Sequence, residues 1–167
     1  ARAYLLLADA RLHDDDPKGA MVYLQDALKR DERLVEARNT LGVVYQGFGD
    51  SISALQELER VVAEAPGMAE GWLNLGNAHR GMGHSADAER AYDVALKLDP
   101  SLADGHYNLG VLFLGSEMEG FSKENRLRRA LEEFDSYRDV RGASLDKKDP
   151  VIAYITEARR LLERAIK

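Results

Sequence analysis

Apolar and small residues return at an interval of 34 positions over most of this chain. The seventh position of each interval holds leucine, and the eighth holds a small residue: Leu7, Leu41, Leu75 and Leu109, then Ala8, Gly42, Gly76 and Gly110. The twentieth position holds alanine: Ala20, Ala54 and Ala88. Repetition at such a period is typical of a solenoid built from one helical unit. The pattern therefore favours an extended binding surface over a catalytic pocket.

Within each interval, apolar residues recur every three or four positions in two stretches, which predicts two helices separated by a turn. In the third interval the two stripes are Trp72, Leu75, Gly76 and His79, and then Ala88, Tyr92 and Ala95. The small eighth residue allows the partner helix to approach closely. We expect each helix pair to bury its stripe only when a neighbouring pair stacks on it. The whole chain is predicted to be helical.

The expected turns carry residues that end one helix and begin the next. Capping candidates stand at the start of each second helix: Asp16, Asp50, and His84 or Ser85. Pro17 follows the first of these at the position that helices accept, and Pro66 and Pro100 close the second and third units.

These residues resemble the tetratricopeptide repeat family, whose signature is Trp-x-x-Leu-Gly-x-x-Tyr, then Ala, an aromatic residue, Ala and Pro. The third interval matches it at seven places: Trp72, Leu75, Gly76, Ala88, Tyr92, Ala95 and Pro100. His79 replaces the tyrosine, and in the second interval Arg38 replaces the tryptophan and Leu58 the aromatic residue. The resemblance implies an all-α, right-handed α-solenoid of helix pairs whose first helices line a concave groove.

We predict one domain over residues 1–167, with repeats at 1–34, 35–68 and 69–102, a degenerate repeat at 103–144 and a capping helix at 149–167. In the degenerate repeat, Ala130 and Phe134 come eight residues later than the period predicts, so Gly115 to Arg129 holds an insertion. This insertion suits a docking element or a flap that packs against its own groove. The second helix of the repeat is expected to bury Leu127, Ala130, Leu131, Phe134, Tyr137 and Val140. The capping helix is expected to bury Ile152, Ile155, Leu162 and Ile166.

Charge and composition narrow the class of function. Residues 1–102 carry 17 acids and 11 bases, whereas residues 103–167 carry 12 of each, and no basic run would bind nucleic acid. The chain has no cysteine, and its apolar runs are too short to insert into a membrane. We expect a soluble protein of the cytoplasm or periplasm. Because the sequence opens without Met in the middle of the pattern, a fragment of a larger or anchored protein is expected.

One face of each predicted first helix is not needed for the core, and it mixes amides with apolar residues. We predict that a peptide-binding groove is formed by Asn39, Thr40, Val43, Leu73, Asn74, Asn77, Arg80, Tyr107, Asn108 and Val111. Side-chain amides can donate to and accept from a peptide backbone, and the apolar residues offer pockets. The resemblance adds that a row of asparagines holds peptide backbone in some family members. The basic clamp with which other members hold chaperone tails is missing, because its places carry Leu5, Asp9 and Thr40.

The histidines and acids do not predict a metal site or a catalytic site. His79 and His106 take aromatic core positions, His84 lies in a turn, and no Asp or Glu completes a ligand pattern at helical spacing. The consecutive acids at residues 14–16 do not alternate as calcium ligands do. We therefore expect no metal, no cofactor and no enzymatic activity.

The sequence predicts a non-catalytic adaptor or assembly scaffold that binds another protein, as an extended peptide or a helix, in the concave groove. A regulatory or substrate-selecting module of a larger enzyme is the first alternative. A self-association module, forming a homo-oligomer in a bacterial envelope assembly, is the second.

Overall fold

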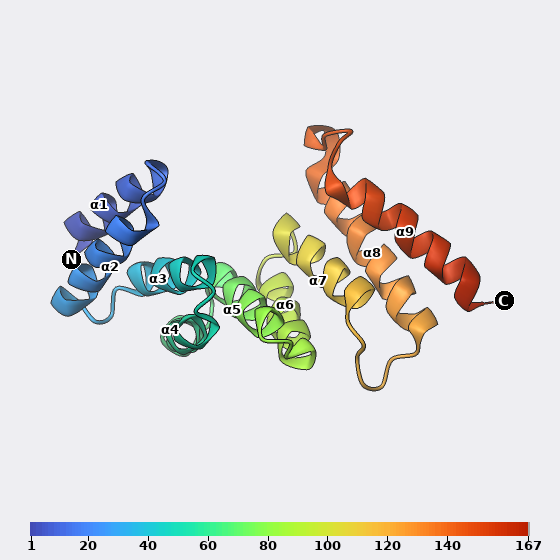
Figure 1. Cartoon of the computed structure of the whole chain (residues 1–167), viewed down its shortest axis with the longest axis horizontal. Helices are drawn as coiled ribbons and strands as arrows, with labels where there is room; N and C mark the ends of the chain where they lie inside the picture. The colour runs from blue at the N-terminus through green and yellow to red at the C-terminus, as the bar shows by residue number, and fades with distance from the viewer. Residues whose placement is uncertain (167) are drawn as a thin grey trace.

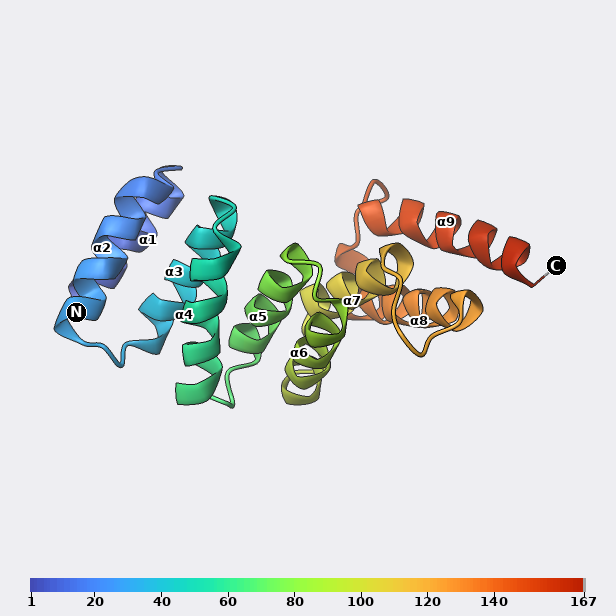
Figure 2. The same cartoon turned by 60° about the horizontal axis from the view of Figure 1, so that its bottom comes forward.

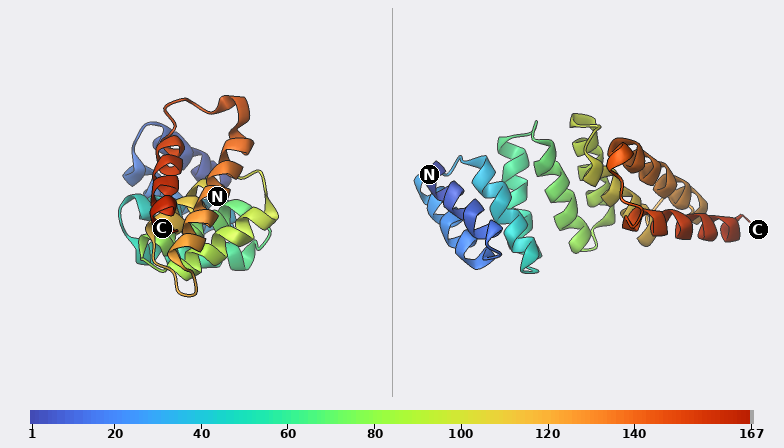
Figure 3. Two further views of the ribbon diagram at one scale, coloured as in Figure 1. Left: turned by 90° about the vertical axis from the view of Figure 1, so that its right-hand side faces the viewer. Right: turned by 90° about the horizontal axis from the view of Figure 1, so that it is seen from above.

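The computed structural model describes residues 1–166 of the chain, and within this range it contains helices and turns without a strand. The helices are α1 (Arg2–His13), α2 (Pro17–Arg30), α3 (Val35–Gly47), α4 (Ser51–Glu64), α5 (Ala69–Gly81), α6 (Ser85–Leu98), α7 (Ala103–Gly115), α8 (Lys123–Arg141), the short 3-10 helix η1 (Gly142–Ser144) and α9 (Pro150–Ala165). The helices form four hairpins, α1–α2 to α7–α8, followed by α9. The hairpins stand in a row along an elongated molecule with its two termini at opposite ends (Figures 1 and 3). The predicted all-α solenoid is confirmed.

The hydrophobic core runs between hairpins as well as within them. The leucine at the seventh position of each later unit packs with the second helix of the preceding unit, as Leu41 does with Leu24 of α2. In the first hairpin the equivalent Leu7 has no preceding helix to cover it among the described residues, and it is 47% exposed. Burial of the repeated stripe therefore depends on stacking, as expected for a solenoid.

The small residue at the eighth position sets the distance between the two helices of a hairpin. A Cβ atom built on Gly76 would lie 2.5 Å from Cε1 of Tyr92, and one on Gly110 would lie 2.5 Å from Cε1 of Phe134. Each aromatic ring thus lies directly on a glycine backbone of the facing helix. The pairing of small and large residues in the sequence pattern is the contact that brings α5 to α6 and α7 to α8.

The turns within the first three hairpins share one backbone conformation. Gly49 and Gly83 have positive φ angles of 75° and 77°, and Asp15 at the equivalent place has a φ of 58°. This left-handed region is strained for side chains other than glycine, although aspartate tolerates it better than most. The first hairpin therefore contains backbone strain that the next two avoid.

Replacing Asp15 with glycine is expected to raise the free energy of unfolding by about 0.5–1 kcal/mol, because the relief of the left-handed strain exceeds the opposing gain in entropy of the unfolded chain. Urea denaturation followed by circular dichroism measures the change. Gly83→Asp should lower stability by a similar amount, and a loss of stability in Asp15→Gly would contradict the prediction.

The predicted caps Asp16 and Asp50 are confirmed, Ser122 caps α8 in the same way, and His84 differs. The side chains of Asp16, Asp50 and Ser122 accept hydrogen bonds from the backbone N–H groups of Gly19, Ser53 and Asn125. His84 occupies the N-cap position of α6, but its side chain makes no capping hydrogen bond within the described chain.

A polar contact recurs at the fourth position of the first helices, although three different residues make it. Nη2 of Arg38 donates to the carbonyl oxygen of Glu32 (2.6 Å), and Nε1 of Trp72 donates to that of Pro66 (2.9 Å). His106 places Nε2 3.1 Å from the equivalent carbonyl oxygen of Pro100. Arg38 thus replaces the expected tryptophan without losing this contact, and its buried guanidinium also pairs with Glu57 at 2.7 Å.

The insertion packs against the end of α7. Met118 is buried in the hydrophobic core formed by residues of α5 to α9, here called the C-terminal core. The ring of Phe121 lies 5.4 Å from that of Phe113. Nη1 of Arg126 donates to the carbonyl oxygens of Phe113 and Ser116, which ties the start of α8 to the end of α7. These contacts favour self-packing over a free docking element.

The last helix contacts both α7 and α8, and its buried face differs from the predicted one. Val151, Ile155 and Ala158 are buried, whereas Ile152 is exposed and Ile166, just after α9, is 57% exposed. The prediction was wrong for Ile152 and Ile166 because Tyr154 and Val151 turn towards Phe134 and the C-terminal core.

Val140, expected on the buried face of α8, is likewise exposed, because it lies near the end of α8, beyond that core. Asp149 caps α9 and accepts a hydrogen bond from the hydroxyl of Tyr137 (2.8 Å).

Within the described residues, no helix combines the length and the apolar character that crossing a bilayer requires.

Candidate functional site

The first helices α3, α5 and α7 contact one another along the row, and their shared face carries linked amides. Nδ2 of Asn74 donates to Oδ1 of Asn39 (3.0 Å), and Nδ2 of Asn108 donates to Oδ1 of Asn77 (3.0 Å). Each bond joins one hairpin to the next. The structure thus brings these four predicted groove residues together in two pairs, and the succession of first helices can be followed in Figure 2.

The second amide pair is anchored to the core. Oδ1 of Asn77 also accepts a hydrogen bond from the hydroxyl of Tyr92 (2.8 Å), whose ring is fully buried. Burial raises the pKa of Tyr92, so this hydroxyl stays protonated as a donor. The contact fixes the orientation of the Asn77 amide without using its N–H groups.

Both pairs leave hydrogen-bonding groups free. Within residues 1–166, no protein group pairs with Oδ1 of Asn74, Nδ2 of Asn77 or Oδ1 of Asn108. In this range the buried side-chain polar atoms without a partner are Nε of Arg38 and Nδ1 of His79. The three unpaired amide groups are not among these buried atoms, so they reach solvent. The face therefore presents both acceptors and a donor.

A hollow of about 300 Å³ opens beside these amides. Its lining comes from four helices: Gln46, Ser51, Asn77, Ala78, Arg80, Gly81 and Asn108. Nε2 of Gln46 donates to the backbone oxygen of Asn74 (2.8 Å), which links α3 to α5. Gln46 lies on the face that the helical period selects but was not among the predicted residues. Ser51 was missed because it lies at the start of a second helix.

The remaining groove candidates, Thr40 and the apolar residues, differ in how far they are exposed to solvent. Val43 is exposed, whereas Leu73 is 8% exposed and belongs to the C-terminal core, where it offers no pocket to a ligand. Thr40 is half-buried, and its hydroxyl donates to the backbone oxygen of Glu36 (3.0 Å). Val111 is half-buried against the C-terminal core.

Tyr107 marks the C-terminal end of the face. Its ring lies 5.4 Å from that of Tyr137 and 5.9 Å from that of Tyr154. Burial, followed by the neighbouring hydroxyl of Tyr154, raises the pKa of Tyr107 to about 12. Because α9 contacts α7 at this point, it lies beside the C-terminal end of this face.

Exposed acids occupy one edge of the same face. Glu36, Glu70 and Asp104 stand at the equivalent place in the first turns of α3, α5 and α7. The exposed Arg80 lies near the other end of α5, at the hollow. The face therefore has an acidic edge, and the cation of Arg80 lies at the opposite edge.

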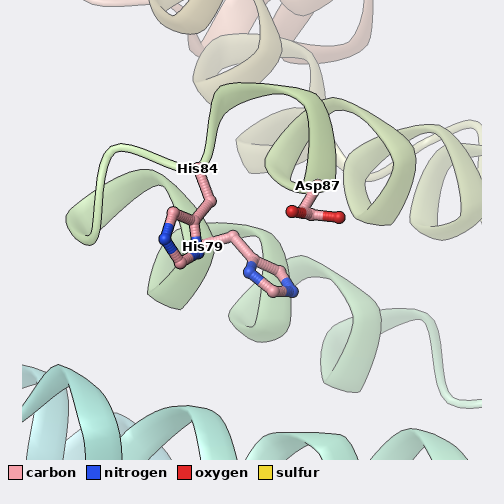
Figure 4. Close-up of side chains that lie close together, drawn as sticks. All are labelled: His79, His84 and Asp87. Atoms are coloured by element: carbon pink, nitrogen blue, oxygen red, sulfur yellow. The ribbon is translucent and has the colours of Figure 1, made fainter.

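A histidine pair with an acid lies at the turn between α5 and α6. His79, His84 and Asp87 each place one ligand atom within 4.8 Å of the others. Figure 4 shows the three side chains near one another at this turn. The prediction from the sequence concerned ligand patterns at helical spacing, whereas this cluster joins residues on two sides of a turn. Spacing along one helix does not reveal Asp87, because the turn folds α6 back onto α5.

Comparisons with known proteins agree with this architecture. Residues 69–102 match the family model described as tetratricopeptide repeat, which confirms the resemblance inferred from the sequence. A crystal structure of MamA superposes with a TM-score of 0.73 at 22% identity, over 99% of this chain and 85% of that one. An O-GlcNAc transferase mutant from Thermobaculum terrenum gives 0.72 at 25% identity, over 80% of this chain and 25% of that one. No curated protein matches the chain in sequence.

A structure of the Cut9–Hcn1 hetero-tetramer of APC/C also superposes, with a TM-score of 0.74 at 20% identity over 98% of this chain and 29% of that one. At such identities the likeness concerns the fold.

Proposed function

Given that the chain carries a tetratricopeptide repeat at residues 69–102 within a solenoid of such helix pairs, we propose that it is a non-catalytic protein-interaction module. It holds a segment of a partner protein against the face formed by α3, α5 and α7. The observation that carries this proposal is the set of free amide groups on Asn74, Asn77 and Asn108.

The free groups suit an extended peptide better than a helix. A helical ligand satisfies its own backbone groups, whereas an extended segment presents N–H and C=O groups that need partners. Oδ1 of Asn74 and Oδ1 of Asn108 can accept from its N–H groups, and Nδ2 of Asn77 can donate to a carbonyl oxygen. Because the hydrogen bonds between the asparagines already hold these side chains in place, little side-chain entropy would be lost when a ligand binds.

The charges favour a basic segment. Glu36, Glu70 and Asp104 line the edge of the face, and residues 1–102 carry six more acids than bases, 17 against 11. Complementary charge speeds association and selects against acidic partners, and its effect weakens with salt. We propose that the partner segment carries Lys or Arg opposite this edge.

The test begins with peptides selected from a random library on the wild-type chain, whose affinities are then measured by calorimetry. The double variant Asn74→Ala with Asn108→Ala should bind them about tenfold more weakly, because each lost hydrogen bond contributes about 0.5–1.5 kcal/mol. Binding should also weaken as salt increases.

Asn125→Ala is the matched control, since Asn125 is exposed at the start of α8 outside the groove. Asn108→Ala alone leaves Asn77 paired with the Tyr92 hydroxyl, so it separates lost binding from lost folding. Unchanged affinity in both groove variants, with intact melting curves, would rule out the amide row as a contact.

A further inference from the structure

The cluster of His79, His84 and Asp87 lies outside the residues that line the hollow, and the proposed function does not use it. His79 belongs to the last turn of α5, His84 is the N-cap of α6, and Asp87 lies in the first turn of α6. The two imidazole centroids are 6.0 Å apart. Figure 4 shows the two rings beside each other at this turn, with the carboxylate of Asp87 close by.

The N-cap residue of the second helix differs between the third hairpin and the two hairpins before it. Asp16 and Asp50 stand where His84 stands, and both cap their helices with a side-chain hydrogen bond that His84 does not make in the described chain. Exchanging such a cap for a residue without one costs roughly 1 kcal/mol. Tyr45 likewise stands where His79 stands. Two neighbouring histidines thus replace residues that serve the fold in the second unit.

The side chain of His79 has a buried nitrogen atom that lacks a hydrogen bond within the described residues. This atom is Nδ1, and a buried polar atom without a partner destabilises the folded state.

We propose that His79, His84 and Asp87 form a binding site for a divalent transition-metal ion of the Zn²⁺ type. Two imidazole nitrogens and one carboxylate oxygen are ligands that such ions accept, with water completing the coordination. A tetrahedral Zn²⁺ with ordinary bond lengths needs donors about 3.4 Å apart. Rotations of the exposed His84 and the half-buried Asp87 about their side-chain bonds would bring the donor atoms from their present separation of up to 4.8 Å towards this distance.

The ion pair between Asp87 and Arg90 is compatible with this site. Nη2 of Arg90 contacts Oδ1 of Asp87, so the other carboxylate oxygen remains for the metal. Carboxylates that bind metals are commonly held by a hydrogen bond of this kind. The ion would tie the end of α5 to the start of α6 and thereby stabilise the third hairpin, since it binds only the folded arrangement.

Calorimetric titration of the untagged chain with Zn²⁺ tests the proposal. We expect one ion per chain and a higher melting temperature with Zn²⁺. His79→Gln, His84→Ala and Asp87→Asn should each weaken binding by at least about tenfold, because even loss of a group that merely orients a ligand costs 10–100-fold. Co²⁺ should give the absorption of a site with imidazole and oxygen ligands in the wild type and lose it in the variants.

His13→Ala is the matched control, because His13 is exposed on α1, far along the chain from this turn. It should bind Zn²⁺ like the wild type. If His79→Gln fails to fold, His84→Ala decides the question, since His84 is exposed and makes no cap. Zn²⁺ affinity unchanged in His84→Ala and Asp87→Asn, or absence of saturable binding to the wild type, would overturn the proposal.

Discussion

Replacing Phe134 with alanine will lower the free energy of unfolding by about 3–5 kcal/mol, the usual cost of removing a buried phenylalanine side chain. Phe134 is fully buried in the C-terminal core and lies directly on the backbone of Gly110. Its ring is stacked on that of Tyr154 at 5.9 Å, with 16° between the planes. The variant therefore loses the contacts that the Phe134 ring makes with α7 and with Tyr154 of α9. Urea denaturation followed by circular dichroism measures the loss.

Phe121→Ala removes the same atoms from the insertion, where the side chain is 39% exposed. It should cost much less, about 1 kcal/mol, because only part of its apolar surface is buried. Near-equal losses in the two variants would mean that the ring of Phe134 does not fill the space between α7 and α8.

Gly76→Ala will lower the free energy of unfolding by about 2–3 kcal/mol, although alanine is the better helix former by about 1 kcal/mol. The added Cβ atom would meet Cε1 and Cδ1 of Tyr92 at 2.5 and 2.6 Å. Since the ring is fully buried, α5 and α6 must move apart to make room. Thermal and urea denaturation measure the change.

Gly47→Ala is the control, because a Cβ atom at Gly47 would have no neighbour within 4 Å. It should leave stability unchanged or raise it slightly. Tyr92→Leu should recover part of the loss when combined with Gly76→Ala, since the first hairpin already pairs Ala8 with Leu24 in its core. A stability gain in Gly76→Ala would contradict the close contact between helices.

The helical period predicted some residues of the candidate site correctly and misplaced others. The period placed Asn39, Asn74, Asn77 and Asn108 on one face, and the structure joins them across neighbouring hairpins. It also placed Leu73 there, but that side chain is buried, because the border between groove and core depends on the angle at which hairpins stack. Tyr107 is packed against Tyr154 of α9, a contact that no repeat position predicts.

The sequence by itself determined the helices, the three regular hairpins and the capping by Asp16 and Asp50, because periodicity and turn chemistry act over a few residues. It also determined which glycines face bulky partners in the regular repeats, since Gly42 and Leu58 stand as far apart in the sequence as Gly76 and Tyr92. Tertiary structure alone decided the buried face of α9, the shared role of Arg38, Trp72 and His106, and the meeting of His79 with Asp87. These contacts depend on how helices cross and how a turn folds back, so their energy comes from residues that no single helical period relates.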